Sequence, residues 1–338
     1  VCHIVLSAVC CIMVQAFCGS RPMQLSSLRT LCFSHFSGLA APRAQAAASS
    51  TIGAGLRMSA VVASRAVSAS AASAPPAAWR KVRVITLDAT GTLMYHRDPI
   101  AEVYCSCAAK VGSQPPPVDA MRTSFKAAFK SSLERWPCFG HAEGLSSREW
   151  WQRTVRAAFD GAGATYGDAE FARVFRRVYQ HFGSAEGYKI FDDTRPFLEW
   201  ASDRYCLGLI TNNVDRLVDN TLPLFGLHEH FRFYVLSHEV GFEKPSREVF
   251  AKAREEASAV LGAPVAPEEM LHVGDNYAAD YCGARAACME AALISRQGVA
   301  QYQTWLNAPD YEGKAQEEVQ EVDSLEGVRR KLELLSEG

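Results

Sequence analysis

The sequence contains no aspartate or glutamate before Asp88, although eight lysines and arginines lie in that stretch. The remaining 27 basic and 37 acidic residues give the rest of the chain a net charge of −10. Such a charge repels polyanions, so we expect neither nucleic acid nor, for the mature protein, a membrane as a partner. Apolar residues make up 48% of the chain, which is ordinary for a globular protein.

Residues 1–79 also lack the composition of a packed domain, because 18 of them are alanine and 13 are serine. The apolar run Ile4–Phe17 is too short to span a bilayer and is typical of a signal-peptide core, with possible cleavage after Ala16. The acid-free sequence that follows has the composition of a transit peptide. We interpret 1–79 as a mostly disordered leader and linker, similar to the bipartite leaders that direct proteins into plastids. Import into the mitochondrion stays open, as does a cytosolic or nuclear protein if the leader is a gene-model artefact and the chain starts at Met58.

The six cysteines after the leader include no C-x-x-C pair and no zinc-ligand spacing. This excludes a structural zinc site of the usual kind and a thioredoxin-like redox motif. Cys206 and Cys288 stand in apolar runs, so we expect both in the core.

Five short runs rich in apolar and β-branched residues predict buried strands. They are Val82–Leu87, Tyr205–Ile210, Phe233–Leu236, Met270–Val273 and Ala291–Ile294. Helical patterns lie before, between and after the last four, at Thr194–Arg204, Val214–Leu224, Ser246–Leu261, Ala278–Met289 and Ser324–Leu335. Strands that alternate with helices predict a doubly wound, Rossmann-like α/β core with a parallel sheet, formed by residues 80–96 and 189–338.

About 100 residues between the first and second strands carry no strong strand signal. Helical spacing of apolar residues predicts helices there, among them Ser147–Gly161 and Asp168–His181. We therefore expect residues 97–188 to form an all-helical cap inserted after the first strand. Ligands bind at the carboxyl ends of the strands in open α/β sheets, so this insertion should act as a lid.

Polar side chains follow four of the predicted strands. Asp88 ends the first, Thr211 ends the second, Lys244 follows the third, and Asp275 ends the fourth. Each has an ordinary alternative, such as a turn residue, a helix cap or a solvated charge. In a parallel sheet these ends are neighbours, so the order of the four predicts carboxylates, a hydroxyl and an ammonium converging on one point. Asp280 lies five residues beyond Asp275.

With Gly91-Thr92 after Asp88 and Gly274 before Asp275, this pattern resembles the four motifs of the haloacid dehalogenase superfamily, in the branch with a helical cap. The resemblance covers residues 80 to 335. Within the superfamily, the chain is similar to the group of haloacid dehalogenase-like hydrolase domain-containing protein 3 and rhythmically expressed gene 2. The segments Trp136–Gly140, Trp150-Trp151 and Phe182–Ser184 carry that closer likeness.

The resemblance implies Mg²⁺ as the cofactor and a small phosphorylated metabolite as the substrate. Asp88 would be the nucleophile that forms an aspartyl-phosphate. Mg²⁺ would be bound by Asp88, by the backbone carbonyl of Thr90 and by Asp275. The sequence leaves the oligomeric state undetermined.

The remaining roles concern the phosphoryl group. Thr211 would bind its oxygens, with Ala89, Thr90 and Asn212 as neighbouring binding positions. Lys244 would neutralise charge where carboxylates and phosphate crowd together. Asp280 would orient Lys244 or the metal-bound waters.

Thr90 departs from the family pattern, because superfamily phosphatases carry an acid/base aspartate at this position. Threonine has no titratable carboxyl, so we expect a phosphatase with weak turnover or, alternatively, a phosphate-binding pseudoenzyme. A phosphonoacetaldehyde hydrolase-type activity, with Lys110, Lys126 or Lys130 forming a Schiff base, is a further alternative. Dehalogenation is disfavoured because dehalogenases of this superfamily lack the Gly-Asp pair, which is kept here as Gly274-Asp275.

Overall fold

The computed structural model describes residues 76–296 and 319–336. The predicted leader therefore lies outside the described residues, apart from its last four. Those four belong to the folded part, since Ala77–Lys81 forms a short 3-10 helix and the Trp79 side chain is 2% exposed. The fold thus begins before the expected residue 80, because the large Trp79 ring packs into the main core. Within the described ranges, no helix has the length and apolarity needed to cross a membrane.

A six-stranded sheet, in the order β5-β4-β1-β6-β7-β8, is parallel throughout. Its strands are β1 (Val84–Leu87), β4 (Cys206–Thr211), β5 (Phe233–Leu236), β6 (Met270–Gly274), β7 (Glu290–Ile294) and β8 (Glu321–Val322). The strand order reverses at β1, which lies between β4 and β6. This is the place where open α/β sheets form a crevice at the carboxyl ends of their strands.

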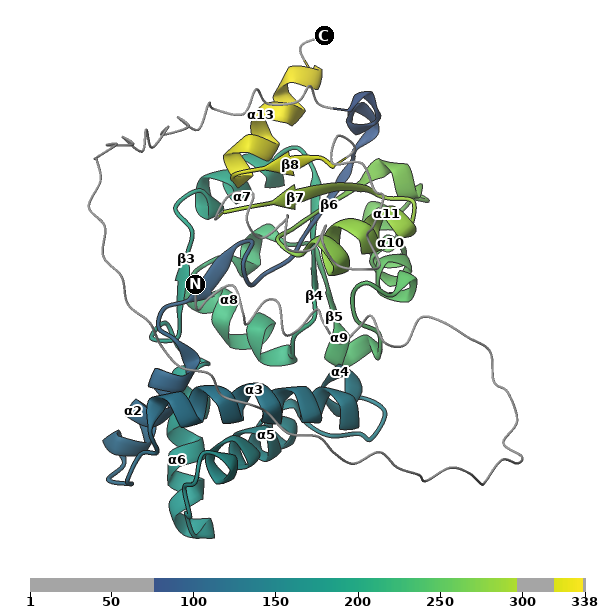
Figure 1. Cartoon of the computed structure of the whole chain (residues 1–338). Coiled ribbons are helices and arrows are strands. Elements are labelled where there is room, and N and C mark those ends of the chain that lie inside the picture. Colours follow the sequence, from purple (N-terminus) through teal and green to yellow (C-terminus); the bar gives the residue numbers. More distant parts are fainter. Residues whose placement is uncertain (1–75, 297–318, 337–338) are drawn as a thin grey trace, which may run out of the picture. The chain divides into compact units, whose positions relative to one another are not determined.

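Helices cover both faces of the sheet (Figure 1). One face packs against α7 (Thr194–Ser202), α8 (Leu222–Leu224) and α13 (Leu325–Ser336), and the other against α10 (Arg247–Leu261) and α11 (Gly283–Ala286). Side chains of one strand alternate between the two cores: Ile85 and Leu87 enter the first, and Val84 enters the second. The predicted α/β fold with a parallel sheet is confirmed.

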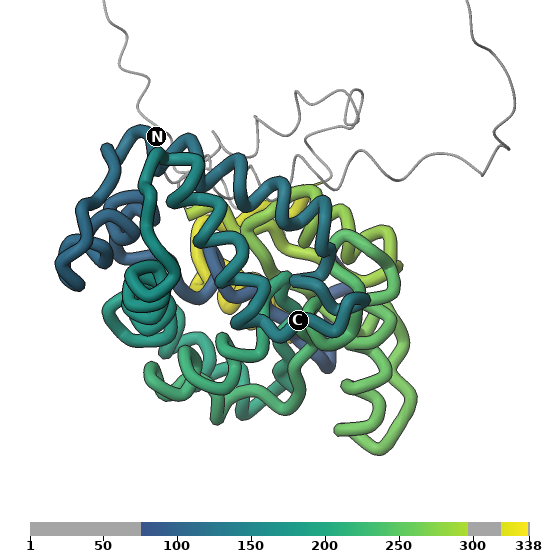
Figure 2. Tube along the Cα trace, turned by 90° about the horizontal axis from the view of Figure 1, so that it is seen from below, coloured from purple at the N-terminus to yellow at the C-terminus, as the bar shows by residue number. Residues whose placement is uncertain are grey.

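The chain between β1 and β4 contains a helical insertion with its own aromatic core, built around Tyr104, Phe125, Phe159 and Phe175. Its helices are α2 (Ile100–Lys110), α3 (Val118–Arg135), α4 (Pro137–Gly140), α5 (Ser147–Gly161) and α6 (Asp168–His181). In Figures 1 and 2, α3 and α5 run side by side, and these two helices pack extensively.

A two-stranded antiparallel ribbon, absent from the sequence prediction, joins this insertion to the sheet. Its strands are β2 (Met94–His96) and β3 (Tyr188–Ile190). Each has three residues and pairs with the other across more than 90 positions of the chain, so neither shows a periodic signal of its own. The His96 ring, at the end of β2, lies against the Tyr188 and Phe182 rings.

Two predicted helices are broken. Leu217–Thr221 and Tyr277–Cys282 are π-helical turns, each followed by a short α-helix. Both π-turns lie within a few residues of strand ends that carry predicted site residues, and π-turns are frequent at functional sites. The expectation for Cys288 was wrong: Cys206 is buried, but Cys288 is exposed at a φ of 63° in the turn after α11.

Candidate active site

Lys244 joins two carboxylates at the carboxyl edge of the sheet. Its Nζ atom donates to Asp88 Oδ1 and lies the same distance, 2.6 Å, from Asp280 Oδ1. A third bond, of 2.8 Å, goes to the carbonyl of Ile210 at the end of β4. The Lys244 side chain is 3% exposed, so three acceptors surround an ammonium that is almost removed from water.

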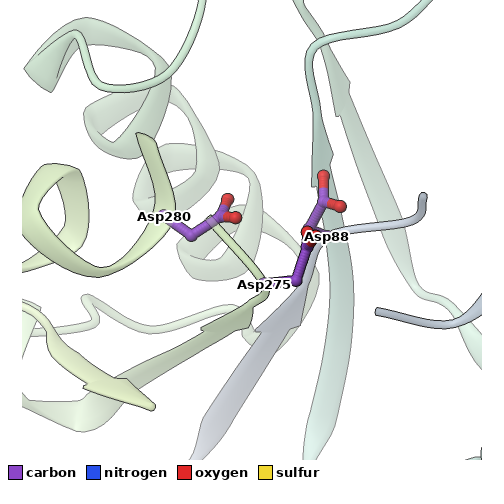
Figure 3. Close-up of side chains that lie close together, drawn as sticks. All are labelled: Asp88, Asp275 and Asp280. Atoms are coloured by element: carbon purple, nitrogen blue, oxygen red, sulfur yellow. The ribbon is translucent and has the colours of Figure 1, made fainter. Parts of the chain in front are cut away.

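Three aspartates converge at this edge (Figure 3). Asp88 follows β1, Asp275 follows β6, and Asp280 stands on the π-turn after β6. One carboxylate oxygen from each lies within 4.8 Å of the others. Three carboxylates and one ammonium, if all are ionised, carry a net charge of −2.

Two glycines allow the carboxylates to approach the backbone. A Cβ on Gly274 would lie 2.2 Å from Asp280 Cγ, and a Cβ on Gly91 would lie 2.2 Å from Asp275 Oδ2. Gly91 also has a φ of 96°, which favours glycine. Glycine at these two positions therefore has a steric reason, because any side chain at Gly91 or Gly274 would displace an aspartate.

Asn212 fixes the loop that carries Lys244. Its Nδ2 donates to the Lys244 carbonyl at 2.9 Å, and its Oδ1 accepts from the Lys244 backbone N–H at 2.8 Å. This reciprocal pair ties the end of β4 to the segment after β5. The structure shows the Asn212 side chain positioning Lys244, and the substrate-binding role of Asn212 stays a prediction.

Thr86 and His272 extend the site into the sheet, and sequence reasoning missed both. They are partners in register on β1 and β6, with the Thr86 hydroxyl 2.9 Å from His272 Nδ1. His272 Nε2 lies 3.1 Å from Asp280 Oδ1. Burial lowers the pKa of His272, so a neutral ring that accepts from Thr86 and donates to Asp280 fits both contacts. The available signal was a pair of polar residues in two otherwise apolar strands.

The carboxylates differ in their affinity for protons. Burial and the charge of Asp280 raise the pKa of Asp88 to about 6, against the effect of Lys244. Burial and the charges of Asp88 and Asp280 raise the pKa of Asp275 well above its ordinary value. Burial also opposes ionisation of Asp280, but Lys244 and His272 outweigh it and hold that pKa below its ordinary value.

These residues fit a divalent cation. Asp88 and Asp275 are oxygen ligands of the kind that Mg²⁺ prefers, and burial together with the neighbouring negative charge raises the pKa of both, against the effect of Lys244. Asp280 is already saturated, since its second oxygen accepts from the Asn276 backbone N–H at 2.9 Å. A cation carrying two charges would match the net −2 of the cluster.

The other predicted positions lie close by without a contact that defines their role. Ala89 is buried at the start of the turn after β1, and its carbonyl accepts from Leu93 and Met94. Thr90 is partly exposed in the same turn. Thr211 is buried at the end of β4, and among the described residues its hydroxyl makes no hydrogen bond to the carboxylate cluster. Phosphate binding by these three residues stays a prediction.

Arg296, which follows β7, holds the turn after Asp88, and sequence reasoning missed it as well. Its Nη2 and Nε atoms donate to the Thr92 carbonyl at 2.6 and 3.2 Å. Its Nη1 lies 2.9 Å from Asp193 Oδ1, and its guanidinium stacks 3.7 Å from the Phe191 ring centroid. A single arginine after an apolar strand gives no sequence signal of this contact.

The family model for haloacid dehalogenase-like hydrolases matches residues 82–287. The chain belongs to this family. Haloacid dehalogenase-like hydrolase domain-containing protein 3 is 32% identical in Xenopus laevis (63% of this chain, 84% of that protein) and 30% identical in Homo sapiens (63% and 82%). The rhythmically expressed gene 2 protein of Drosophila melanogaster is 25% identical over 65% of this chain and 85% of its own length. The predicted resemblance is therefore confirmed.

Solved structures support the fold. YfnB from Bacillus subtilis, bound to magnesium, aligns with a TM-score of 0.55 at 17% identity, over 75% of this chain and 99% of its own. The defluorinating L-2-haloacid dehalogenase Rha0230 aligns with a TM-score of 0.56 at 17% identity, over 77% and 98%. One fold thus serves a magnesium-bound protein and a dehalogenase, so the reaction must be argued from the site.

Proposed function

We propose that this hydrolase is a magnesium-dependent phosphatase of a small phosphorylated metabolite, with slow turnover. The observation that carries the proposal is the contact of Lys244 with Asp88 and Asp280, next to Asp275, at the switch point of the sheet. A binding site for an oxyanion needs positive charge, and nucleophilic attack needs a carboxylate oxygen that is held in place. This cluster supplies both once a cation is bound.

Asp88 and Asp275, with the backbone carbonyl of Thr90, would hold Mg²⁺. Bound there, the ion would supply positive charge to the phosphoryl oxygens and to the carboxylates around them. Lys244 holds Asp88 Oδ1, which leaves Oδ2 as the oxygen that attacks. His272 and the Asn276 backbone fix Asp280, so Asp280 in turn orients Lys244.

The reaction would take two displacements at phosphorus. In the first, Asp88 Oδ2 forms a bond to phosphorus and the bond to the leaving oxygen breaks, giving an aspartyl-phosphate and an alkoxide that takes up a proton. In the second, water bonds to phosphorus, loses a proton, and releases inorganic phosphate and the Asp88 carboxylate. Each step moves a proton, and Thr90 has no carboxyl to accept or donate it.

A phosphate-binding protein without turnover is the second candidate, and Thr90 is the observation that favours it. No observation favours a phosphonatase, because Lys110 and Lys130 are exposed and Lys126 is partly exposed. Among the described residues, Lys244 is the lysine whose charge shifts the pKa values of Asp88, Asp275 and Asp280.

Phosphoenzyme formation distinguishes the two candidates. With Mg²⁺ and p-nitrophenyl phosphate, whose leaving group needs no proton, we expect covalent phosphate on the intact protein by mass spectrometry. The expected mass increase disappears in Asp88→Asn and in the presence of a chelator. A wild-type protein that binds Mg²⁺ but acquires no phosphate on Asp88 would establish the binding protein instead.

A further inference from the structure

Arg216 lies where the helical insertion meets the loop that follows β4. Its guanidinium carbon is 3.6 Å from the centroid of the Tyr179 ring on α6. A Cβ on Gly183 would lie 1.7 Å from Arg216 Nη2, so the guanidinium packs directly on the Gly183 backbone. A side chain from the core is thus held by two residues of the insertion.

The guanidinium of Arg216 forms no ion pair with a described carboxylate. Burial lowers the pKa of two arginines in the described part of the chain, Arg216 and Arg296. Arg296 is paired with Asp193 at 2.9 Å, whereas no described carboxylate oxygen lies within 4.0 Å of the Arg216 guanidinium. The Tyr179 side chain hydrogen-bonds Arg216, and the adjacent Asp215 offsets part of its charge, but the Asp215 carboxylate accepts from the Arg216 backbone N–H and not from the guanidinium. Partly buried cations are normally paired, so an anion from outside the described chain would complete this site.

A second arginine shares the same ring. The guanidinium carbon of Arg148, at the start of α5, lies 5.7 Å from the Tyr179 centroid and 5.5 Å from that of Phe175. It too has no described carboxylate oxygen within 4.0 Å. Because Arg148 is exposed beside the same ring, its charge adds to the positive potential around Arg216 that would attract an anion.

The loop connects this arginine pair to the phosphoryl site. Arg216 follows Thr211 by five residues, so their Cα atoms are at most about 18 Å apart. The true separation is shorter, since the Leu217 backbone N–H donates to the Val214 carbonyl in a turn. Val214 itself packs on Phe139 and Trp150 of the insertion. The loop from Thr211 to Arg216 therefore runs along the junction between core and insertion.

We propose that Arg216, together with Arg148, binds a second anionic group, a carboxylate or a phosphate, on the same small substrate whose phosphoryl group is transferred to Asp88. The inference rests on the proposed function and adds a substrate class, phosphomonoesters with two anionic groups. A guanidinium presents paired N–H donors that match the two oxygens of either group.

Matched ester pairs test this inference. One pair is 3-phosphoglycerate and glycerol 3-phosphate, and the other is 1,3-propanediol bisphosphate and 3-hydroxypropyl phosphate. For each pair we measure kcat/KM for phosphoenzyme formation and divide the value for the ester with two anionic groups by the value for the ester with one. We expect the wild-type ratio to exceed about ten in at least one pair, and Arg216→Gln to lower it about tenfold or more, the loss for one hydrogen-bonded charge pair.

Two further variants separate recognition from folding. Gly183→Ala keeps the charge of Arg216 but displaces its guanidinium, so it should also lower the ratio. Arg216→Lys should give a ratio between those of Arg216→Gln and the wild type. Arg204→Gln is the matched control, because Arg204 likewise lies over an aromatic ring, that of Trp200, but precedes β4 at the opposite end of the strand. The ratio should not change there.

A wild-type ratio near one in both pairs would overturn the inference, as would an Arg216→Gln variant that slows both members of a pair equally. p-Nitrophenyl phosphate separates this failure from failure of the proposed function. If p-nitrophenyl phosphate phosphorylates Asp88 while the kcat/KM ratios are near one, only the assignment of a second anion site is refuted. If it does not, the phosphatase itself is wrong.

Discussion

Thr90 stands in the turn between the nucleophile position and Gly91, partly exposed, where a phosphatase of this family would place its acid/base group. General acid–base catalysis contributes about 10²–10⁴-fold in rate. The remaining groups, Asp88 and Lys244, do not depend on Thr90 for their contacts. Loss of the carboxyl should therefore slow proton transfer without dismantling the site, and the aspartyl-phosphate should persist.

Thr90→Asp should raise steady-state turnover at least about tenfold, at the cautious end of the contribution of such a group. The metal ligand at this position is the backbone carbonyl, so the substitution should keep Mg²⁺ binding. Turnover of p-nitrophenyl phosphate and the lifetime of the phosphoenzyme are the measurements. Thr90→Asn, which lacks a titratable group, is the control and should give no increase. Wild-type turnover equal to that of Thr90→Asp would mean that another residue moves the proton.

The acidity of Asp88 gives the site a pH dependence. Its pKa is raised to about 6 by burial, so below pH 6 the metal-free protein holds a proton on a carboxylate that Mg²⁺ needs ionised. Affinity for Mg²⁺ should then fall as the pH falls, by about tenfold per unit for each displaced proton. Isothermal titration should show at least about tenfold weaker binding at pH 5 than at pH 7. Equal affinities at the two pH values would contradict the assignment of Asp88 as a ligand.

The two strands of the linking ribbon are the elements that join the insertion to the site. β2 begins directly after Leu93, and β3 ends directly before Phe191. Thr194 Oγ1 and the Phe191 backbone N–H both donate to the Leu93 carbonyl, at 2.7 and 3.1 Å. Arg296 adds its bonds to Thr92 and Asp193. The bases of both linkers are thus fixed to the turn after Asp88.

Arg296→Ala should loosen this anchor. The Thr92 carbonyl loses both hydrogen bonds from the guanidinium. The mostly buried Asp193 carboxylate loses its cationic partner and keeps only the hydrogen bond from the Leu325 backbone N–H among these contacts. We expect a loss of about 1–3 kcal/mol in the free energy of unfolding and weaker Mg²⁺ binding. Denaturant melts and calorimetry measure the two effects. Lys252→Ala, which removes an exposed pair with Glu256, is the control and should cost less than about 1 kcal/mol. A loss no larger than that of the control would refute the anchor.

The sequence predicted elements well where local signals were complete. Helix α5 has an amphipathic pattern and a capping box between Ser146 and Glu149, and its predicted bounds are those observed. The ribbon was missed because β2 and β3 are short and pair across the insertion. The broken helices were predicted as continuous, because the residue spacing in Leu217–Thr221 and Tyr277–Cys282 does not distinguish a π-turn from an α-helix.

The candidate site divides in the same way. Asp88, Lys244, Asp275 and Asp280 were predictable because parallel strands bring their carboxyl ends together, and the structure shows them in one cluster. The contacts of His272 and Arg296 were not predictable. These contacts depend on which strands are neighbours in the sheet and on the direction of each side chain. No sequence motif includes either residue.

Charge is unevenly distributed over the whole chain. Residues 97–188 contain 12 basic and 10 acidic residues, whereas residues 189–338 contain 15 and 26. An anionic substrate is therefore repelled by the core unless positive charge is concentrated at the site. Lys244 supplies one such charge and a bound divalent cation would supply the rest.

Residues 1–79 should direct the protein into an organelle, with the plastid favoured. The motive is the apolar run Ile4–Phe17 followed by acid-free sequence rich in alanine, serine and arginine. Residues 1–79 fused to a fluorescent protein should give signal inside that organelle, and the same fusion without Ile4–Phe17 should not reach a plastid that is entered through the secretory pathway. Diffuse cytosolic fluorescence of the complete fusion would refute the targeting role.

The most direct test of the account is stabilisation by Mg²⁺ with beryllofluoride, which mimics the phosphoryl group of an aspartyl-phosphate. A ligand at a hundredfold excess over its dissociation constant stabilises a native protein by about 2.7 kcal/mol. We predict at least that increase for the wild type with both components, a smaller one with Mg²⁺ alone, and none from beryllofluoride in Asp88→Asn. An unchanged melting temperature of the wild type at saturating Mg²⁺ and beryllofluoride, or an equal increase in Asp88→Asn, would contradict a phosphoryl site built on Asp88.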